Sequence, residues 1–86
     1  MRAELSAEAE KTLDRLDRPT AARIRARLRE LEADPFDARI SKPLVQAEGK
    51  RSSRVGGWRI IFIVEQTARA LSVLAIRPRG QAYKRI

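Results

Sequence analysis

The side chains of this chain that could perform chemistry are mostly cationic and lie in its second half. Its 86 residues include neither His nor Cys, so the commonest general base, the commonest metal ligand and any thiolate nucleophile are absent. Residues 44–86 hold 9 Lys or Arg and 2 Asp or Glu, whereas residues 1–43 hold 10 and 9. A one-sided basic surface is typical of a polyanion binder. We therefore favour a nucleic acid or an acidic protein as partner over a charge that only aids solubility.

Arg59 is the first candidate for binding a phosphate. It lies in the run 58–64, whose alternation and β-branched residues predict a strand. Arg59 then faces away from the apolar Trp58 and Ile60 on either side of it. Its planar guanidinium suits a bidentate grip on a phosphate. The alternative is a surface arginine paired with Glu65 or with a protein partner.

Two more arginines flank a proline near the C-terminus. Arg77 and Arg79 lie on either side of Pro78, where a predicted strand ends. Alternation puts both arginines on one side, where they would form a phosphate clamp. Tyr83 is the only Tyr and is close to a basic tail. It could stack on a base or serve as a half-buried anchor, and both interpretations carry equal weight.

The elements that must position these residues follow from the hydrophobic pattern. Arg2–Leu5 predicts a short strand, and Ser6 predicts the N-cap of a helix of about three turns. Pro19 suits the first position of a second helix, which ends at Asp34-Pro35. Residues 36–49 are expected to form a loop.

The second half of the chain predicts an antiparallel meander. Strands are expected over 50–55, 58–64 and 70–76, with turns at Gly56-Gly57 and at 65–69. The order β-α-α-β-β-β predicts one α+β domain over the whole chain, with a helical hairpin packed on an antiparallel-rich sheet. No apolar run is long enough to span a membrane, and no signal peptide is evident, so we expect a cytoplasmic protein without a membrane partner.

Four parts of the sequence resemble the RelE/ParE superfamily of bacterial and archaeal toxins. Residues 5–16 resemble its opening strand and first helix, and Asp34-Pro35 with Lys42-Pro43-Leu44 resembles the turn after its second helix. The run 54–62 (RVGGWRIIF) resembles the signature R-V-G-x-[YW]-R-[IV]-[IV]-[YF]. Residues 76–83 (IRPRGQAY) resemble its R-x-x-x-Y ending. The signature is the most specific of these parts, and the resemblance spans nearly the whole chain.

The resemblance implies a toxin that is neutralised by a co-expressed antitoxin, here expected to be acidic, extended and partly helical. RelE-type members act on mRNA in the ribosomal A site. ParE-type members act on DNA gyrase and usually lack the catalytic residues. We expect a ribosome-dependent mRNA endonuclease. The alternatives are a ParE-like gyrase inhibitor and a catalytically inactive module that binds RNA or the antitoxin.

The expected cleavage uses no metal and no cofactor. The ribose 2′-OH attacks the adjacent phosphate in line, and preorganised cations stabilise the charge that develops. The resemblance implies these catalytic residues: Arg59, Arg77 or Arg79, Tyr83 and Lys50. Further RNA contacts are expected from Arg51, Arg54, Lys84 and Arg85.

The sequence departs from the family at one catalytic position. Counting back from Arg59, Lys50 and Ser52 occupy two alternating positions that are basic in RelE-type toxins. The general base is therefore either Lys50 or no lysine at all. Arg51 is one residue out of register, and only a bulge would bring it to the same face.

Overall fold

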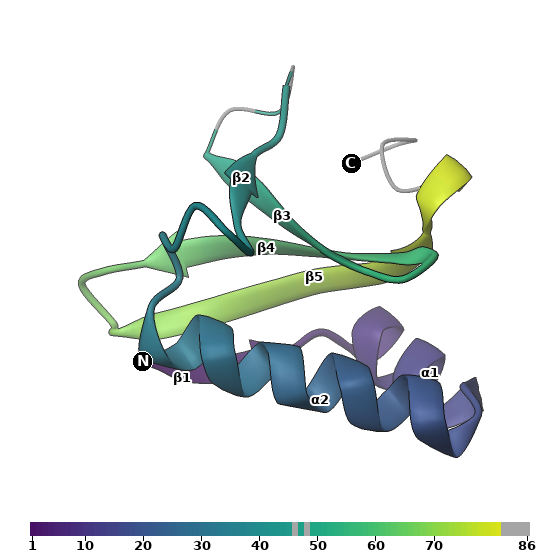
Figure 1. Cartoon of the computed structure of the whole chain (residues 1–86). Coiled ribbons are helices and arrows are strands. Elements are labelled where there is room, and N and C mark those ends of the chain that lie inside the picture. The colour runs from purple at the N-terminus through teal and green to yellow at the C-terminus, as the bar shows by residue number, and fades with distance from the viewer. Residues whose placement is uncertain (46, 48, 82–86) are drawn as a thin grey trace.

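The computed structural model describes residues 1–45, 47 and 49–81, which form two layers (Figure 1). Both helices pack on one face of a mixed sheet whose strand order is β1-β5-β4-β3-β2. The elements are β1 (Arg2–Leu5), α1 (Ala7–Arg15), α2 (Arg18–Ala33), β2 (Lys42–Pro43), β3 (Lys50–Val55), β4 (Trp58–Glu65), β5 (Ala70–Pro78) and the 3₁₀ turn η1 (Arg79–Gln81). The predicted α+β fold, with a helical hairpin on a largely antiparallel sheet, is confirmed.

The predicted loop over residues 36–49 was wrong in one respect. It contains the short strand β2, in which Lys42 pairs with Ser52 and Pro43 pairs with Arg51 of β3. Two residues carry no hydrophobic periodicity, so the pattern gave no signal for this strand. Pro43 is tolerated because β2 lies at the edge of the sheet.

Each helix begins at a side-chain cap. Ser6 accepts a hydrogen bond from the Ala9 amide at 3.1 Å, as the predicted N-cap of α1. Asp17 caps α2 by accepting from the Thr20 amide, also at 3.1 Å. The helix therefore begins at Arg18, and Pro19 is its second residue, not its first. The cap also lowers the pKa of the Asp17 carboxyl, because its charged form accepts from the Thr20 hydroxyl and amide.

Two apolar clusters lie on opposite faces of the sheet. The larger lies under the helices and contains Leu13, Ile24, Leu28 and Leu31 of the helices with Ile60, Phe62, Leu71, Val73 and Ile76 of the strands. Trp58 packs against this cluster and is half buried. The smaller cluster joins Leu44 to Ile61 and Ala75 on the other face. The helices therefore leave that face only partly covered.

A β-bulge in β5 decides which side chains reach the partly covered face. Ile61 pairs with Ala75 and Phe62 pairs with Val73, so Leu74 is the extra residue between them. Before the bulge, odd-numbered residues of β5 face the helices, as Val73 does. After it, even-numbered residues do, as Ile76 does. Arg77 is therefore placed across from Arg59.

Among the residues that the structure describes, neither helix has the length and apolar character needed to cross a membrane.

Ser6 joins the start of α1 to this bulge, which gives a test of the fold. Its hydroxyl donates to the Leu74 carbonyl at 2.6 Å while it caps the helix. We expect Ser6→Ala to lower the free energy of unfolding by about 2 kcal/mol, because a cap and a partner for a bulge carbonyl are lost together. Urea unfolding measures the change. Thr67→Ala, in the exposed β4–β5 turn, is the control, and equal losses in both variants would contradict the prediction.

Candidate functional site

A basic hollow opens at the edge of the sheet where β2 ends and β3 continues. Its volume is about 420 Å³. It is lined by Arg27, Arg39, Ile40, Lys42, Ser52, Arg54, Gly56 and Arg59. Five of these side chains are cationic, and no acidic side chain of the described residues lines the hollow. We call it the basic hollow.

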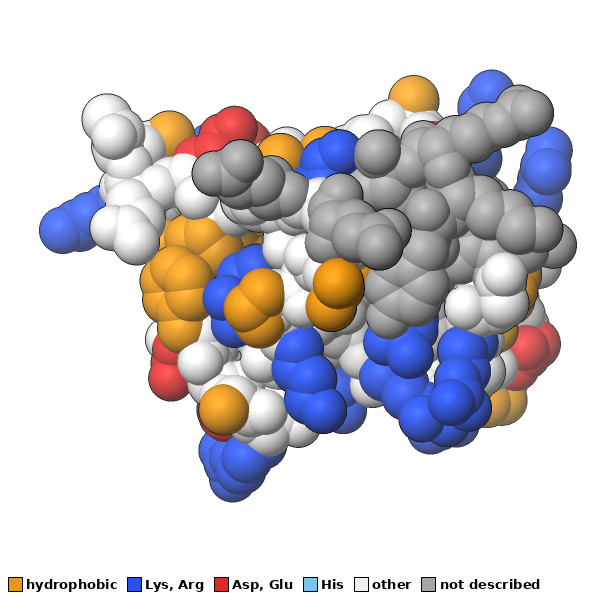
Figure 2. Space-filling model, turned by 90° about the horizontal axis from the view of Figure 1, so that it is seen from above, with side chains coloured by type: hydrophobic (Ala, Val, Ile, Leu, Met, Phe, Trp, Pro, Cys, Tyr) orange, Lys and Arg blue, Asp and Glu red, His pale blue; other side chains and the backbone are white. Residues whose placement is uncertain are grey.

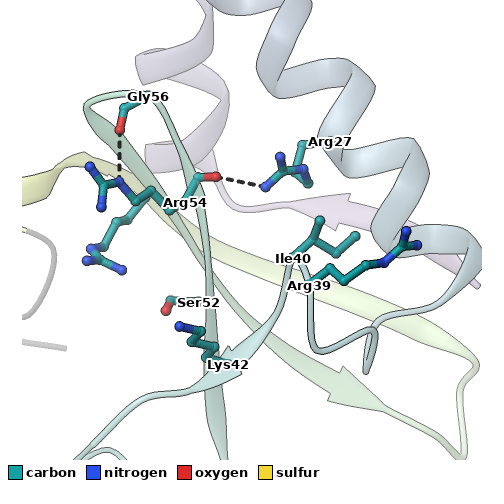
Figure 3. Close-up of a pocket in the computed structure, with 8 residues that line it drawn as sticks. Arg27, Arg39, Ile40, Lys42, Ser52, Arg54 and Gly56 are labelled. Carbon is teal, nitrogen blue, oxygen red and sulfur yellow. Dashed lines mark hydrogen bonds between the residues drawn. The ribbon is translucent and has the colours of Figure 1, made fainter.

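The lining residues come from separate segments that the fold brings together. Figure 3 shows Arg27 reaching from α2 toward the backbone of Arg54, with Lys42 and Ser52 side by side below. The view of the face away from the helices shows Lys and Arg side chains gathered along its lower margin (Figure 2). The site is therefore assembled by tertiary contacts and is open to solvent on one side.

Three arginines form a row across neighbouring strands. Arg54 pairs with Arg59, and Arg59 pairs with Arg77. Directly opposed residues have Cβ atoms about 5 Å apart, and like charges at that separation destabilise a sheet. A row of three cations is thus a cost to folding, and a bound anion would relieve it. Arg59 also faces away from Trp58 and Ile60, as the alternation predicted.

Arg77 is turned toward α1 by an ion pair. Its Nε donates to Oε2 of Glu8 at 2.9 Å, and its Nη2 donates to Oε1 at 3.1 Å. The hydrogen bonds from Arg77, and its positive charge, favour the ionised carboxylate and hold the pKa of Glu8 below its usual 4.5. Part of the charge in the arginine row is therefore compensated from the helical layer.

The predicted clamp of Arg77 and Arg79 rests on an alternation that the structure does not have. The strand ends at Pro78, and Arg79 begins the 3₁₀ turn η1. The Arg79 amide donates to the Gly57 carbonyl at 2.8 Å, which ties this turn to the β3–β4 hairpin. A chain that leaves the extended conformation no longer places alternate residues on one side.

Lys50 and Arg51 lie apart from the basic hollow. Lys50 pairs with Ile63, four residues along β4 from Arg59, or about 13 Å. It lines a neighbouring hollow of about 330 Å³. Arg51 faces the helix side across from Phe62. The β3–β4 pairing is regular from end to end, so no bulge turns Arg51 toward Lys50.

Arg51 instead has a structural role. Its Nε donates to the Ser41 hydroxyl at 2.8 Å, and its guanidinium lies 5.0 Å from the centre of the Phe36 ring. These contacts attach the segment between α2 and β2 to β3. Tyr83, Lys84 and Arg85, predicted as site residues, lie outside the described residues.

Three basic residues of the site, Arg27, Arg39 and Lys42, were missed from the sequence. Lys42 was part of a motif for a turn, and its place across from Ser52 depends on β2, which the pattern did not reveal. Arg27 was one of several polar residues on a helix. Its Nη1 donates to the Ser53 hydroxyl at 3.0 Å and to the Arg54 carbonyl at 2.7 Å. No sequence signal distinguishes it from its neighbours on α2.

Arg39 is compensated within its own loop. It donates to both carboxylate oxygens of Asp37, from Nε at 3.1 Å and from Nη2 at 2.7 Å. These bonds lower the pKa of Asp37 to about 2, so the pair stays ionised at neutral pH. Arg27 likewise donates to Glu30 at 3.2 Å. Within the described part of the chain, Lys42 and Arg54 line the hollow without an ion pair to an acidic side chain.

The Glu8–Arg77 pair predicts a dependence of stability on pH. The pKa of Glu8 is lower in the folded state than in the unfolded state. Its contribution to the free energy of unfolding is therefore full at a pH above the unfolded-state pKa, and it is lost as the pH falls through the folded-state pKa. We expect Glu8→Gln to lower the free energy of unfolding by at most about 1 kcal/mol at neutral pH, since the carboxylate is half exposed. The free energies of unfolding of the wild type and Glu8→Gln, measured with urea, should become equal as the pH falls from about pH 5 to pH 3.

Glu10→Gln is the matched control for this measurement. Glu10 shares the first turn of α1 and reports the interaction with the helix dipole alone. A difference between the wild type and Glu8→Gln that stays constant with pH would contradict the prediction. So would an equal convergence for Glu10→Gln.

A family model described as the ParE toxin of type II toxin–antitoxin system, parDE, matches residues 3–83. The comparison with curated proteins gave no match.

Solved structures of low sequence identity share the fold. The toxin–antitoxin complex RelBE2 from Mycobacterium tuberculosis contains a chain 21% identical, with a TM-score of 0.79, over 91% of this chain and 96% of that one. A chain of the archaeal RelE–RelB complex from Pyrococcus horikoshii is 22% identical, with a TM-score of 0.79, over 94% of this chain and 97% of that one. The YoeB/ParE toxin from Agrobacterium tumefaciens is 20% identical, with a TM-score of 0.77, over 91% of this chain and 98% of that one. On the family match, which spans nearly the whole sequence, this chain belongs to the ParE toxins of type II toxin–antitoxin systems, within the RelE/ParE superfamily.

Proposed function

We propose that this toxin is an endoribonuclease that cleaves mRNA on the ribosome, with the scissile phosphate bound in the basic hollow. The observation that carries the proposal is Arg59, which lies in the hollow and at the centre of the row of three arginines. A sheet that places arginines opposite one another is stabilised by a ligand that brings negative charge to them. A phosphodiester carries that charge on two non-bridging oxygens, which a planar guanidinium can bind as a bidentate pair.

The proposed reaction is an in-line transfer within the RNA strand. The ribose 2′-oxygen forms a bond to phosphorus and gives up its proton, and the bond from phosphorus to the 5′-oxygen breaks. The 5′-oxygen takes up a proton, which leaves a 2′,3′-cyclic phosphate and a 5′-hydroxyl. Arg59 stabilises the negative charge on the phosphoryl oxygens where it is greatest, in the transition state.

The other predicted residues take more peripheral parts in this proposal. Lys50, in the neighbouring hollow, contacts the RNA strand beyond the scissile phosphate and is not assigned as the proton acceptor. Arg54 shares the scissile phosphate with Arg59, its partner across the β3–β4 hairpin. Arg79, in the turn η1, extends the contact beyond the end of β5. Tyr83, Lys84 and Arg85 stay predicted RNA contacts that lie outside the described residues. Arg51 lines the same neighbouring hollow as Lys50, but it is left out because its guanidinium is already bound to Ser41 and lies against the Phe36 ring.

The proposed antitoxin is a co-expressed protein that presents an acidic segment to this same surface. The net charge of +8 favours such a partner. The similar structures from Mycobacterium tuberculosis and Pyrococcus horikoshii are described as toxin–antitoxin complexes. An acidic segment over the basic hollow would exclude RNA by occupying the same cations.

The second candidate function is inhibition of DNA gyrase. Two observations favour it: the matching family model is named for ParE, and Ser52 stands where RelE-type toxins carry a basic residue. Such an inhibitor is a binding protein, and it would not need Arg59 to stabilise a transition state.

Replacement of Arg59 tests the nuclease proposal. We expect Arg59→Ala to reduce mRNA cleavage at least about a hundredfold, the effect of removing one preorganised donor from a transition state. Cleavage is measured by primer extension on a reporter mRNA after induction in cells. Arg29→Ala, an exposed arginine of α2, is the matched control and should cleave like the wild type.

The same experiment separates the two functions. Cuts confined to translated regions and lost in Arg59→Ala would support the nuclease. Intact mRNA with accumulating gyrase–DNA cleavage complexes would reject it in favour of the inhibitor.

A further inference from the structure

Lys42 is a cation of the basic hollow that the predicted catalytic set does not include. It lies on β2, directly across from Ser52 of β3. Its side chain is exposed, and within the described part of the chain it has no acidic partner. Ser52 is 5% exposed and small, so the position opposite Lys42 has no second bulky side chain.

The spacing of Lys42 from the arginine row is set by the strand register. Lys42 pairs with Ser52, which pairs with Ile61, and this row lies two residues along the sheet from the row of Arg54 and Arg59. Two residues of a strand span about 7 Å along the strands, and neighbouring strands are about 5 Å apart. Lys42 is thus offset from Arg54, which shares the Arg59 phosphate in the proposed function, by about 7 Å along the sheet and one strand across it, and from Arg59 by one strand more. Lys and Arg side chains are long enough to bring their charged ends from these positions to neighbouring phosphates of one extended strand.

We propose that Lys42 binds the phosphate next to the one held by Arg59, so that the basic hollow takes two consecutive phosphates of a single RNA strand. This inference rests on the proposed function and adds a footprint and a positioning residue to it. The ligand class is a single-stranded oligonucleotide with at least two phosphates. By holding the second phosphate, Lys42 fixes the register in which the strand enters the hollow.

The other lining cations are less suited to this second phosphate. Arg39 is bound to both oxygens of Asp37, and Arg27 is bound to Glu30 and to two acceptors on β3. These contacts hold each guanidinium in place, and moving it to follow a phosphate would loosen them. The Lys42 ammonium has three rotatable donors on a flexible stem, and it can follow a phosphate without that loss.

A comparison of two short ligands tests the footprint on the full-length protein. The probes are a 2′-O-methyl dinucleotide with one phosphate and a 2′-O-methyl trinucleotide with two, neither of which can be cleaved. Binding is measured by NMR titration at about 0.1 M salt, where charges farther apart than about 10 Å are largely screened. We expect Lys42→Gln to weaken trinucleotide binding about tenfold and to leave dinucleotide binding unchanged. Lys42→Arg should bind both probes like the wild type, because it keeps the charge.

Arg59→Ala separates this inference from the proposed function. Both probes should bind more weakly to it, because the phosphate at Arg59 is common to them. If Arg59→Ala weakens both and Lys42→Gln weakens neither, or both equally, the role of Lys42 is rejected while the hollow remains an RNA site. If Arg59→Ala changes neither, the proposed function and the inference fall together. A fivefold or greater loss by Lys42→Gln on the trinucleotide alone supports the inference.

Discussion

The site depends on the register of β4, which is held by the burial of two side chains under the helices. Ile60 and Phe62 are both 0% exposed, and truncating such residues typically costs a few kcal/mol. A slip of one residue would turn both toward the partly covered face and would put Arg59 into the core. The same apolar contacts that stabilise the domain therefore keep Arg59 between Arg54 and Arg77.

The fold compensates part of the positive charge that gathers in and beside the basic hollow. Glu8 binds Arg77 from α1, Asp37 binds Arg39 within the loop, and Glu30 binds Arg27 along α2. These pairs are largely exposed, and each is worth little by itself. Because these pairs compensate some of the cations, the attraction for an anion is strongest at the few cations that have no acidic partner in the described part of the chain, instead of being spread over the whole surface. Under the proposed function, those positions bind the sugar–phosphate chain.

The proposed antitoxin and the proposed RNA would use the same feature. Each is an extended polyanion, and the basic hollow accepts negative charge from one open side. Two ligands that neutralise the same cations compete for them, because each set of charges can be paired only once. Neutralisation of a toxin by direct occupation of its working surface would follow from this competition without a change in the fold.

The amino-acid pattern by itself determined the kinds of elements and their order. Alternation in 58–64 identified β4 and the direction of Arg59, and Ser6 and Asp34-Pro35 correctly marked helix boundaries, because these signals are local. The family resemblance through the run 54–62 was also local and is consistent with the family match. These features depend only on residues that are close in sequence.

Tertiary structure decided what the residues of the site touch. The extra residue at Leu74 brings Arg77 across from Arg59, and Glu8 then draws its guanidinium toward α1, although 69 residues separate the two in sequence. The pairing of Lys42 with Ser52 depends on a two-residue strand, too short to leave a hydrophobic period. Bulges, edge pairing and long-range ion pairs depend on how the layers pack, so the periodicity of hydrophobic residues in the sequence does not predict them.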